Sequence, residues 1–415
     1  MRLNISDKLS LKKVVSFNII TNLLVLLYSQ VICDYFYFMS FIKIVPDIFN
    51  IITLIYVACF NTIHLKKGKI CGIILLFFVI YALFSFAWSE GKLSDGIGRI
   101  RYILTGFWMF YCCTNYADSD LINKIMKILY VSIWIHTLLV VYQCFVLKVG
   151  IDISNGIFGF KEYNNAAQGI YCLALSVLGI TSYMFKRTSR FKSMIMILLP
   201  CITCALSEIK AFYIEFAIVV LIVIFYCIKD GKKRNRILFI ISIVIIGGIV
   251  AYQILLKIMP ENLYAFSSLD SLIFYESWET GRAGGYGRFS QIQWVFSQAF
   301  SNDIMKTIFG LGILDKKEVI VYELSKTFFN FGAIGLILLI SFFVTNIVIL
   351  WKIKSKSMFK AVSICFSVVE LISLFMWNAT LNRMSYLGFM IIALGYCDTF
   401  SNCNEMKEEV RKCIS

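Results

Sequence analysis

Apolar segments of about 20 residues recur along this chain of 415 residues, and one long polar stretch, residues 259 to 326, interrupts them. An α-helix needs about 20 apolar residues to cross a bilayer. Hydrophobic residues make up 59% of the chain and charged residues only 16%, which excludes most soluble classes. The sequence therefore predicts an all-α polytopic membrane protein with about 12 transmembrane helices and one large extracytoplasmic loop.

The expected spans follow the apolar segments and divide the chain into four regions. A first bundle of nine spans covers residues 1–258, the large loop covers 259–326, three further spans occupy 327–400, and a tail covers 401–415. The spans lie near residues 14–33, 44–63, 70–88, 102–116, 125–147, 166–185, 194–206, 211–228, 237–258, 328–351, 361–377 and 385–400.

The placement of the basic residues accounts for the formal charge of +15, so this charge does not indicate a nucleic-acid partner. Most of them gather at alternate ends of the apolar segments, the pattern that marks the cytoplasmic side of a membrane protein. The long loop is left out of this comparison, because long segments translocate whatever their charge. We expect both termini in the cytoplasm, the first span retained as a signal anchor, and the long loop outside.

The number and positions of the cysteine and histidine residues argue against a metal site, and we expect no cofactor. The 14 cysteines fall mostly within spans and lack the spacing of zinc ligands, so small apolar packing residues are the expected role. His64 is expected at the inner interface and His136 inside the fifth span as a hydrogen-bonded packing residue. A histidine-based active site on the outer face is therefore not expected.

Two short outer segments carry charges close to the apolar layer. Arg99 and Arg101 lie at the outer start of the fourth span, where they would meet lipid phosphates as headgroup anchors or as ligands of a specific substrate. Glu208 and Lys210 lie in a very short connection. They would either pair with each other or leave Lys210 to bind a lipid phosphate.

A third outer segment, residues 156 to 168, combines glycines with adjacent asparagines before the sixth span. Such a composition suits a turn that re-enters the membrane surface. Asn164 or Asn165 would cap the helix that follows, since asparagine is a favoured N-cap residue.

The long loop contains the run GRAGGYGR at residues 281 to 288. Its glycines leave backbone N–H groups free while Arg282 and Arg288 supply guanidinium groups, a combination suited to an anion such as diphosphate. Residues 288–300 then predict an amphipathic helix that ends near residues 310–312, with apolar residues at helical spacing: Phe289, Ile292, Phe296 and Phe300.

Six acidic residues in or near the loop are candidates for a general base: Asp270, Glu276, Glu279, Asp303, Glu318 and Glu323. Glu323 is the strongest of them. The next span begins just after it and would hold it near the membrane surface, where partial loss of water would make its carboxylate a better proton acceptor.

In their order around one large outer loop, these features resemble the O-antigen ligase and polymerase superfamily, the Wzy-type enzymes that build bacterial surface polysaccharides. The resemblance spans most of the chain. Its elements are the turn at residues 156–168, SEIKA at 207–211, Gly287 and Arg288 followed by the amphipathic stretch, FGLG at 309–312, and FGAIG at 331–335.

The resemblance implies a glycosyltransferase of the bacterial cytoplasmic membrane that needs neither metal nor other cofactor. It would polymerise undecaprenyl-diphosphate-linked oligosaccharides on the outer face into capsule, O-antigen or exopolysaccharide, with a flippase and a chain-length regulator as partners. Lys210 and Arg288 match basic positions of the family and become candidate diphosphate ligands, whereas Arg282, Arg99 and Arg101 rest on their chemistry alone.

Ligases of this superfamily carry a His-Asn pair, nine residues and then Gly-x-x-Gly. Counting back from Gly332 gives Val321 and Tyr322, so the ligase base is absent and a repeat-unit polymerase is favoured. Glu323 is the nearest acidic substitute and would accept the proton of the attacking hydroxyl.

Three alternatives remain open at this stage. One is a ligase-like glycan transferase, and another is a lipid-linked oligosaccharide flippase or other transporter. Transporters usually carry charge inside the bundle and are built from two related halves, and the sequence contains no convincing internal repeat. The third, an assembly or sensor protein, would leave Lys210 and Arg288 unexplained.

Overall fold

The computed structural model describes residues 5–60, 68–150, 153–160, 164–227, 234–258, 288–314, 320, 322–353, 357–376, 380–382 and 384–397. These residues form helices and connecting turns, with no strand among them. Within the described part of the chain, seven helices are long and apolar enough to cross a membrane, and Ala211–Cys227 and Ser385–Cys397 are shorter apolar helices. The all-α membrane class predicted from the sequence is confirmed at this level.

The helices follow one another with short connections. The first half contains α1 (Ile5–Tyr35), η1 (Tyr37–Ile44), α2 (Val45–Phe60), α3 (Lys69–Phe84), η2 (Ser85–Trp88), α4 (Leu93–Tyr116), α5 (Ser119–Val141), η3 (Tyr142–Val146), η5 (Gly156–Phe158) and α6 (Asn165–Met184). The second half contains α7 (Arg190–Leu206), α8 (Lys210–Cys227), α9 (Arg234–Ile258), α11 (Arg288–Trp294), η9 (Val295–Ala299), α12 (Ile304–Phe309), α13 (Glu323–Lys352), α14 (Met358–Met376) and the unlabelled helix Ser385–Cys397.

A helix lies at each expected span, but α1 and α4 begin earlier than their apolar segments. Their first turns are polar and continue the backbone hydrogen bonding past the point where hydropathy falls. For α4 this extension matters, because it places residue 99 inside a helix rather than in a connecting loop.

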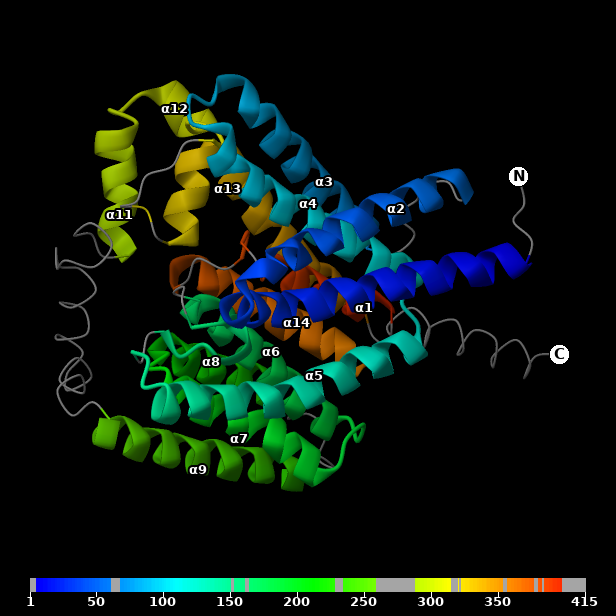
Figure 1. Ribbon diagram of the computed structural model, residues 1–415, viewed down its shortest axis with the longest axis vertical. Helices are drawn as coiled ribbons and strands as arrows, with labels where there is room; N and C mark the ends of the chain where they lie inside the picture. Colours follow the sequence, from blue (N-terminus) through cyan, green and yellow to red (C-terminus); the bar gives the residue numbers. More distant parts are fainter. Residues whose placement is uncertain are drawn as a thin grey trace.

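The helix α6 lies at the centre of the molecule (Figure 1). It packs against α7, α8 and α14, and its most apolar stretch of 18 residues is completely buried. By contrast, only 17% of the corresponding stretch within Tyr37–Cys59 is buried. Apolar side chains left exposed on such outer helices are suited to contact lipid.

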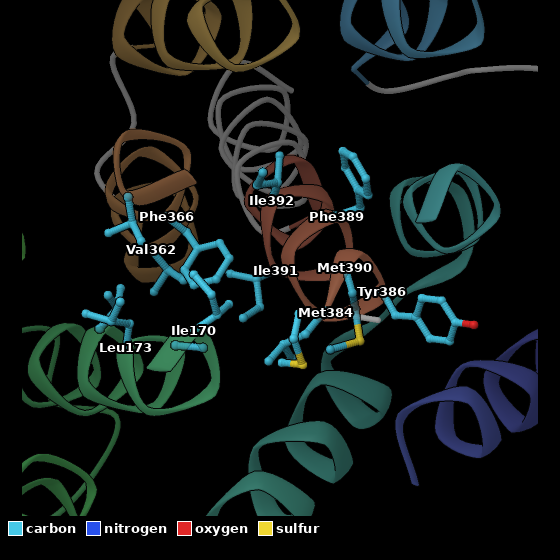
Figure 2. Close-up of a cluster of buried hydrophobic side chains, with 14 of the residues drawn as sticks. Ile170, Leu173, Val362, Phe366, Met384, Tyr386, Phe389, Met390, Ile391 and Ile392 are labelled. Atoms are coloured by element: carbon cyan, nitrogen blue, oxygen red, sulfur yellow. The ribbon is translucent and has the colours of Figure 1, made fainter. Parts of the chain in front are cut away.

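Apolar side chains of α6, α14 and the helix Ser385–Cys397 pack against one another. Figure 2 shows Phe366 of α14 and Ile170 of α6 near Met384 and Ile391 at and within the helix Ser385–Cys397. Aromatic rings extend this core, with Phe342 of α13 lying 5.3 Å from the ring of Phe389. These contacts fix the last helix between α14 and α13.

Amide side chains join α1 to α2. Asn18 and Asn22 donate to the Oδ1 of Asn50 at 3.0 Å, and Asn50 donates back to Asn22 at 3.2 Å. Because a polar group in hydrocarbon lacks water, such a reciprocal network stabilises the pairing of two membrane helices.

The predicted amphipathic helix after residue 288 is present, but its expected apolar face is partly wrong. Val295 and Phe300 are buried, whereas Phe296 is 45% exposed. The cause is a π-helical turn at η9, in which Phe300 donates its N–H to Val295 five residues earlier. That wider turn rotates the later side chains away from regular helical spacing. The helix ends at η9, and the separate helix α12 is the one that stops at Gly310.

Candidate active site

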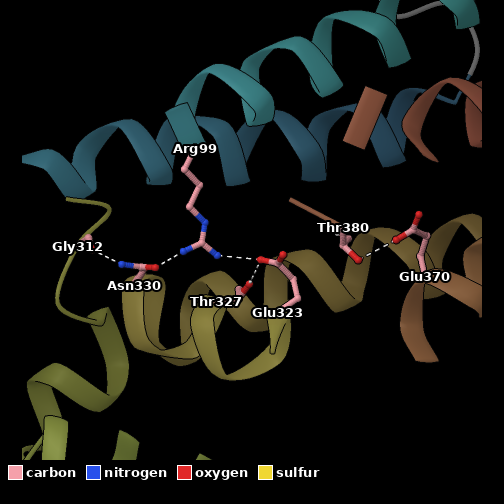
Figure 3. Close-up of polar contacts among 7 residues, drawn as sticks. All are labelled: Arg99, Gly312, Glu323, Thr327, Asn330, Glu370 and Thr380. Atoms are coloured by element: carbon pink, nitrogen blue, oxygen red, sulfur yellow. Dashed lines mark hydrogen bonds and ion pairs between the residues drawn. The ribbon is translucent and has the colours of Figure 1, made fainter. Parts of the chain in front are cut away.

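Two of the candidate residues form a buried ion pair. The Nη2 of Arg99 on α4 donates to the Oε1 of Glu323 on α13 at 2.8 Å, and the two side chains are only 10% and 1% exposed (Figure 3). The Arg99 guanidinium also donates to the Oδ1 of Asn330 and lies over the ring of Phe331. The positive charge is therefore held on three sides by α13.

A break in α13 places Asn330 toward Arg99. Gly332 has φ 58° and ψ −161° inside the helix, and a Cβ there would lie 2.3 Å from the carbonyl oxygen of Ile308. Only glycine fits such a backbone at such a close approach. The first turns of α13, which carry Glu323 and Asn330, are thus set at an angle to the long apolar remainder.

The carbonyl groups released by this break find new partners. Leu311 and Gly312 donate their N–H groups to the carbonyls of Phe329 and Asn330 at 2.9 Å. The Tyr81 hydroxyl on α3 donates to the Phe331 carbonyl at 3.1 Å. Broken helices within a membrane bundle are tolerated where neighbours satisfy the freed backbone, and they are frequent at binding sites.

The Glu323 carboxylate uses its two oxygens differently. Oε1 accepts from Arg99 and, at 3.4 Å, from the Thr327 hydroxyl one turn later. Oε2 is buried and has no hydrogen-bond partner among the described residues. The arrangement fixes one oxygen of the carboxylate against a cation and leaves the other without a hydrogen bond from the described part of the protein.

Two further buried carboxyl groups lie in the neighbouring helices. Glu370 of α14 accepts from the Thr380 hydroxyl at 2.8 Å and is close enough to Glu323 for electrostatic interaction (Figure 3). Glu215 of α8 accepts from Ser373 of α14 at 3.0 Å. The sequence reasoning missed these acids, although an ionisable residue inside an apolar segment is a signal for a functional position.

A pocket with a volume of about 860 Å³ opens beside the broken helix. It is bounded by η2, η9 and α12, and it extends to Gly310 and Leu311, which pair with α13. Its polar side chains are Glu90, Gln298, Asp303 and Lys306, and its aromatic side chains are Trp88, Trp294 and Phe309. Trp88 also packs edge-on against Phe309.

Arg101 does not join Arg99, although only one residue separates them in the sequence. Its guanidinium binds the Asp47 carboxylate at 2.7 Å and also donates to the Lys43 carbonyl. Residues two apart lie on different faces of a helix, so Arg101 links α4 to α2 instead. Its observed contacts belong to helix pairing.

The turn before α6 packs inside the bundle, whereas its predicted re-entry into the membrane surface stays a prediction. Residues 154–159 are all buried, and Gly156 exchanges two hydrogen bonds with the side chain of Gln143 at 2.7 and 3.0 Å. Asn164 occupies the N-cap position of α6, but its side chain donates to the Phe158 carbonyl rather than to the helix. The expected capping bond is therefore replaced by a bond that closes the turn.

The α7–α8 connection packs against this turn. The Ser207 hydroxyl donates to the Ser154 carbonyl at 2.6 Å, and Gln168 of α6 donates to Ser207 at 3.0 Å. Glu208 adopts φ 55° in the turn, and α8 begins at Lys210. The side chain of Lys210 lies outside the described residues, so its expected pairing with Glu208 remains a prediction.

Several other candidates lie outside the part of the chain that the structure describes. Arg282, Asp270, Glu276, Glu279 and Glu318 are among them, and of Arg288 only the backbone is described, as the first residue of α11. Three residues later, Gln291 accepts from the Tyr322 N–H at 3.3 Å. The start of α11 therefore lies beside the start of α13. Asp303 is described and caps α12 through the Met305 N–H at 2.8 Å.

Comparison with known proteins adds no family assignment to this geometry. No protein-family model matches the chain, and no curated protein matches it significantly.

Proposed function

We propose that this protein is an integral-membrane glycosyltransferase that joins oligosaccharide units carried on undecaprenyl diphosphate into a bacterial surface polysaccharide. The observation that carries the proposal is the buried Arg99–Glu323 ion pair at the start of α13. Ionisable groups held within a membrane bundle are costly and are a default sign of function. This pair lies at the start of α13, where the long polar segment rejoins the bundle.

The proposal includes a topology with twelve crossings, in the bacterial cytoplasmic membrane. The spans would be α1 to α9, α13, α14 and Ser385–Cys397, with both termini in the cytoplasm and residues 259–326 outside. The clustering of basic residues at alternate helix ends supports this orientation. The active site would then face the side on which lipid-linked oligosaccharides are displayed.

In the proposed reaction, a sugar hydroxyl of one lipid-linked unit attacks the anomeric carbon of another. The new glycosidic C–O bond forms as the bond from the anomeric carbon to the diphosphate breaks, and undecaprenyl diphosphate leaves with the electron pair. The free Oε2 of Glu323 accepts the hydroxyl proton. Burial of the reacting ends limits competing attack by water.

Different cations are assigned different tasks in this proposal. Lys210 and Arg288 would bind the diphosphate and stabilise its developing charge. Arg99 is already bonded to Glu323 and Asn330, so it acts as a positioning residue that holds the base in its orientation. Arg282 would assist Arg288 through the glycine-rich run.

The pocket beside α12 is suited to the saccharide part of the substrate. Its volume of about 860 Å³ lies in the usual range for small-molecule sites, and it offers indole faces together with carboxylate and amide groups. Leu311 connects the pocket to the backbone of α13, so a bound sugar would lie next to the catalytic segment.

A paired substitution tests the proposal without leaving a lone buried charge. Cells with Arg99→Gln/Glu323→Gln are expected to display single repeat units, with long polymer reduced at least a hundredfold for want of the base. The matched control, Asp120→Asn/Lys124→Gln, removes an exposed ion pair and should keep normal polymer. Electrophoresis of surface glycan, with immunoblots of membrane protein, gives the readout. Normal polymer in the first variant contradicts the assignment of Glu323.

A second candidate is a lipid-linked oligosaccharide transporter, favoured by one observation. Glu215 and Glu370 are buried within α8 and α14, and charge inside the bundle is typical of transporters. The two functions differ in what deletion leaves behind. Loss of a polymerase leaves single units on the cell surface, whereas loss of a transporter traps lipid-linked units in the inner leaflet.

A further inference from the structure

A second pocket lies at the other end of the bundle from α11 and α12, where α6 ends and α7 and α9 begin (Figure 1). Its volume is about 400 Å³. Three basic side chains line it, Lys186, Arg190 and Arg236, and no acidic residue does so among those described. None of the three takes part in an ion pair within the described chain.

The backbone around this pocket adds further positive potential. Both α7 and α9 begin here, and the first N–H groups of a helix carry a partial positive charge. Two helix starts and three cations therefore face one small volume. An anion bound between them would relieve the mutual repulsion of these charges.

The pocket is also rigidly built. Lys186 adopts φ 60° after α6, and Arg187 donates its N–H back to the Ser182 carbonyl at 2.8 Å, which closes the helix end. Hydroxyl bonds of 2.9 and 2.7 Å then connect Ser182, Thr188 and Ser193 across the turn.

Aromatic rings and a backbone carbonyl hold the two arginines in place. Arg236 lies over Tyr183 and donates to the Met184 carbonyl at 2.9 Å. Arg190 lies over Phe239, whose ring packs 4.9 Å from that of Tyr183. Preorganised guanidinium groups lose less conformational entropy when they bind a phosphate.

The geometry points to this pocket as a binding site for the phosphate of an anionic phospholipid. Exposed apolar side chains occur in the same helix starts, with Phe191, next to Arg190 in α7, 61% exposed and Leu238, near the start of α9, 54% exposed. A lipid places its phosphate among the cations and its acyl chains along these side chains, whereas a free phosphate ion gains nothing from them. In the proposed topology the lipid belongs to the cytoplasmic leaflet.

Ligand-dependent thermal unfolding of the purified full-length protein in uncharged detergent tests this site. Short-chain phosphatidylglycerol is titrated against short-chain phosphatidylcholine and inorganic phosphate, and the rise in Tm gives an apparent Kd for each. The wild-type protein is expected to respond to phosphatidylglycerol alone. The variant Lys186→Gln/Arg190→Gln should weaken that affinity about tenfold or more, since two phosphate-binding charges are lost.

The matched control is Arg187→Gln/Lys192→Gln, which removes two positive charges from the same turn without changing the pocket lining. Its affinity should stay within about threefold of the wild-type value. If the two variants lose the same affinity for phosphatidylglycerol, the lipid is attracted by diffuse surface charge and the proposed site is wrong. If inorganic phosphate raises the Tm as much as phosphatidylglycerol does, the site does not select a lipid. If phosphatidylcholine raises the Tm as much as phosphatidylglycerol does, both the site and its preference for an anionic lipid are wrong. Tm without ligand verifies that each variant is folded.

Discussion

Arg99 and Glu323 both lose contact with water in the folded protein, and each gains one opposite charge in return. Such a pair contributes little net stability, because the cost of removing two charges from water offsets most of their attraction. Its effect appears when one partner is removed and the other stays buried without compensation. The pair is therefore better understood as a device that fixes the position of a carboxylate.

A double-mutant cycle measures this coupling. Arg99→Gln and Glu323→Gln are each expected to lower the free energy of unfolding by about 3 kcal/mol, since each leaves one uncompensated buried charge. The double variant, with two neutral amides, should recover most of that loss. Denaturant unfolding in mixed micelles gives the three values. Strictly additive losses would mean that the two groups do not interact in the membrane protein.

At the residue scale the sequence identified the individual groups but not their partnership. Arg99 and Glu323 were both candidates, yet their contact joins positions far apart in the chain, and no local pattern reports that distance. Asn330 and Glu370 were missed for a related reason. Each is a single polar residue in an apolar helix, and only its neighbours reveal whether it faces lipid or the protein interior.

At the element scale, the break in α13 depends on two chain segments that fit each other. Gly332 brings its backbone against Ile308 and Gly310, while Leu311 and Gly312 take up the carbonyls that the break releases. The sequence predicted a helix start near this point and an amphipathic helix before it. It could not predict the break or the π-helical turn, because both arise from contacts between the two segments.

Substitution at Gly332 tests the importance of this break. Gly332→Ala places a Cβ 2.3 Å from the Ile308 carbonyl oxygen at a φ of 58°, so we expect a loss of stability of about 2 kcal/mol or more. Gly98→Ala, beside Arg99, is the control. A Cβ there meets nothing within 4 Å, and stability should hold or rise by up to about 1 kcal/mol. Equal stability of both variants in thermal unfolding would contradict the strained geometry.

At the scale of the whole molecule, hydropathy predicted where helices lie but not which of them are interior. In the central helix α6 the most apolar 18 residues are all buried at a mean hydropathy of 1.3, whereas the corresponding stretch of Glu323–Lys352 has a mean hydropathy of 2.7 and only 33% of it is buried. In a soluble protein the most apolar helix would be expected inside. In a membrane the lipid is itself apolar, so burial follows close packing and polar contacts instead.

The proposed topology requires that opposite ends of the bundle lie on opposite sides of the membrane. Ser301 is an exposed turn residue between η9 and α12, and Ser119 is an exposed residue at the start of α5. An impermeant thiol reagent added to intact cells is expected to label Ser301→Cys at least tenfold more than Ser119→Cys, because the membrane excludes the reagent from the second site. The unsubstituted chain, whose cysteines are mostly buried, gives the background.

Permeabilised cells should label both positions equally, which verifies that each thiol is reactive. The reverse pattern in intact cells would place α11, α12 and the Arg99–Glu323 pair on the cytoplasmic side. Lipid-linked oligosaccharides displayed outside could not then reach Glu323, and the proposed polymerisation would fail. The proposed anionic-lipid site would not be contradicted by that outcome. Its lipid would then lie in the outer leaflet, because the cations that line the pocket do not depend on the orientation of the protein.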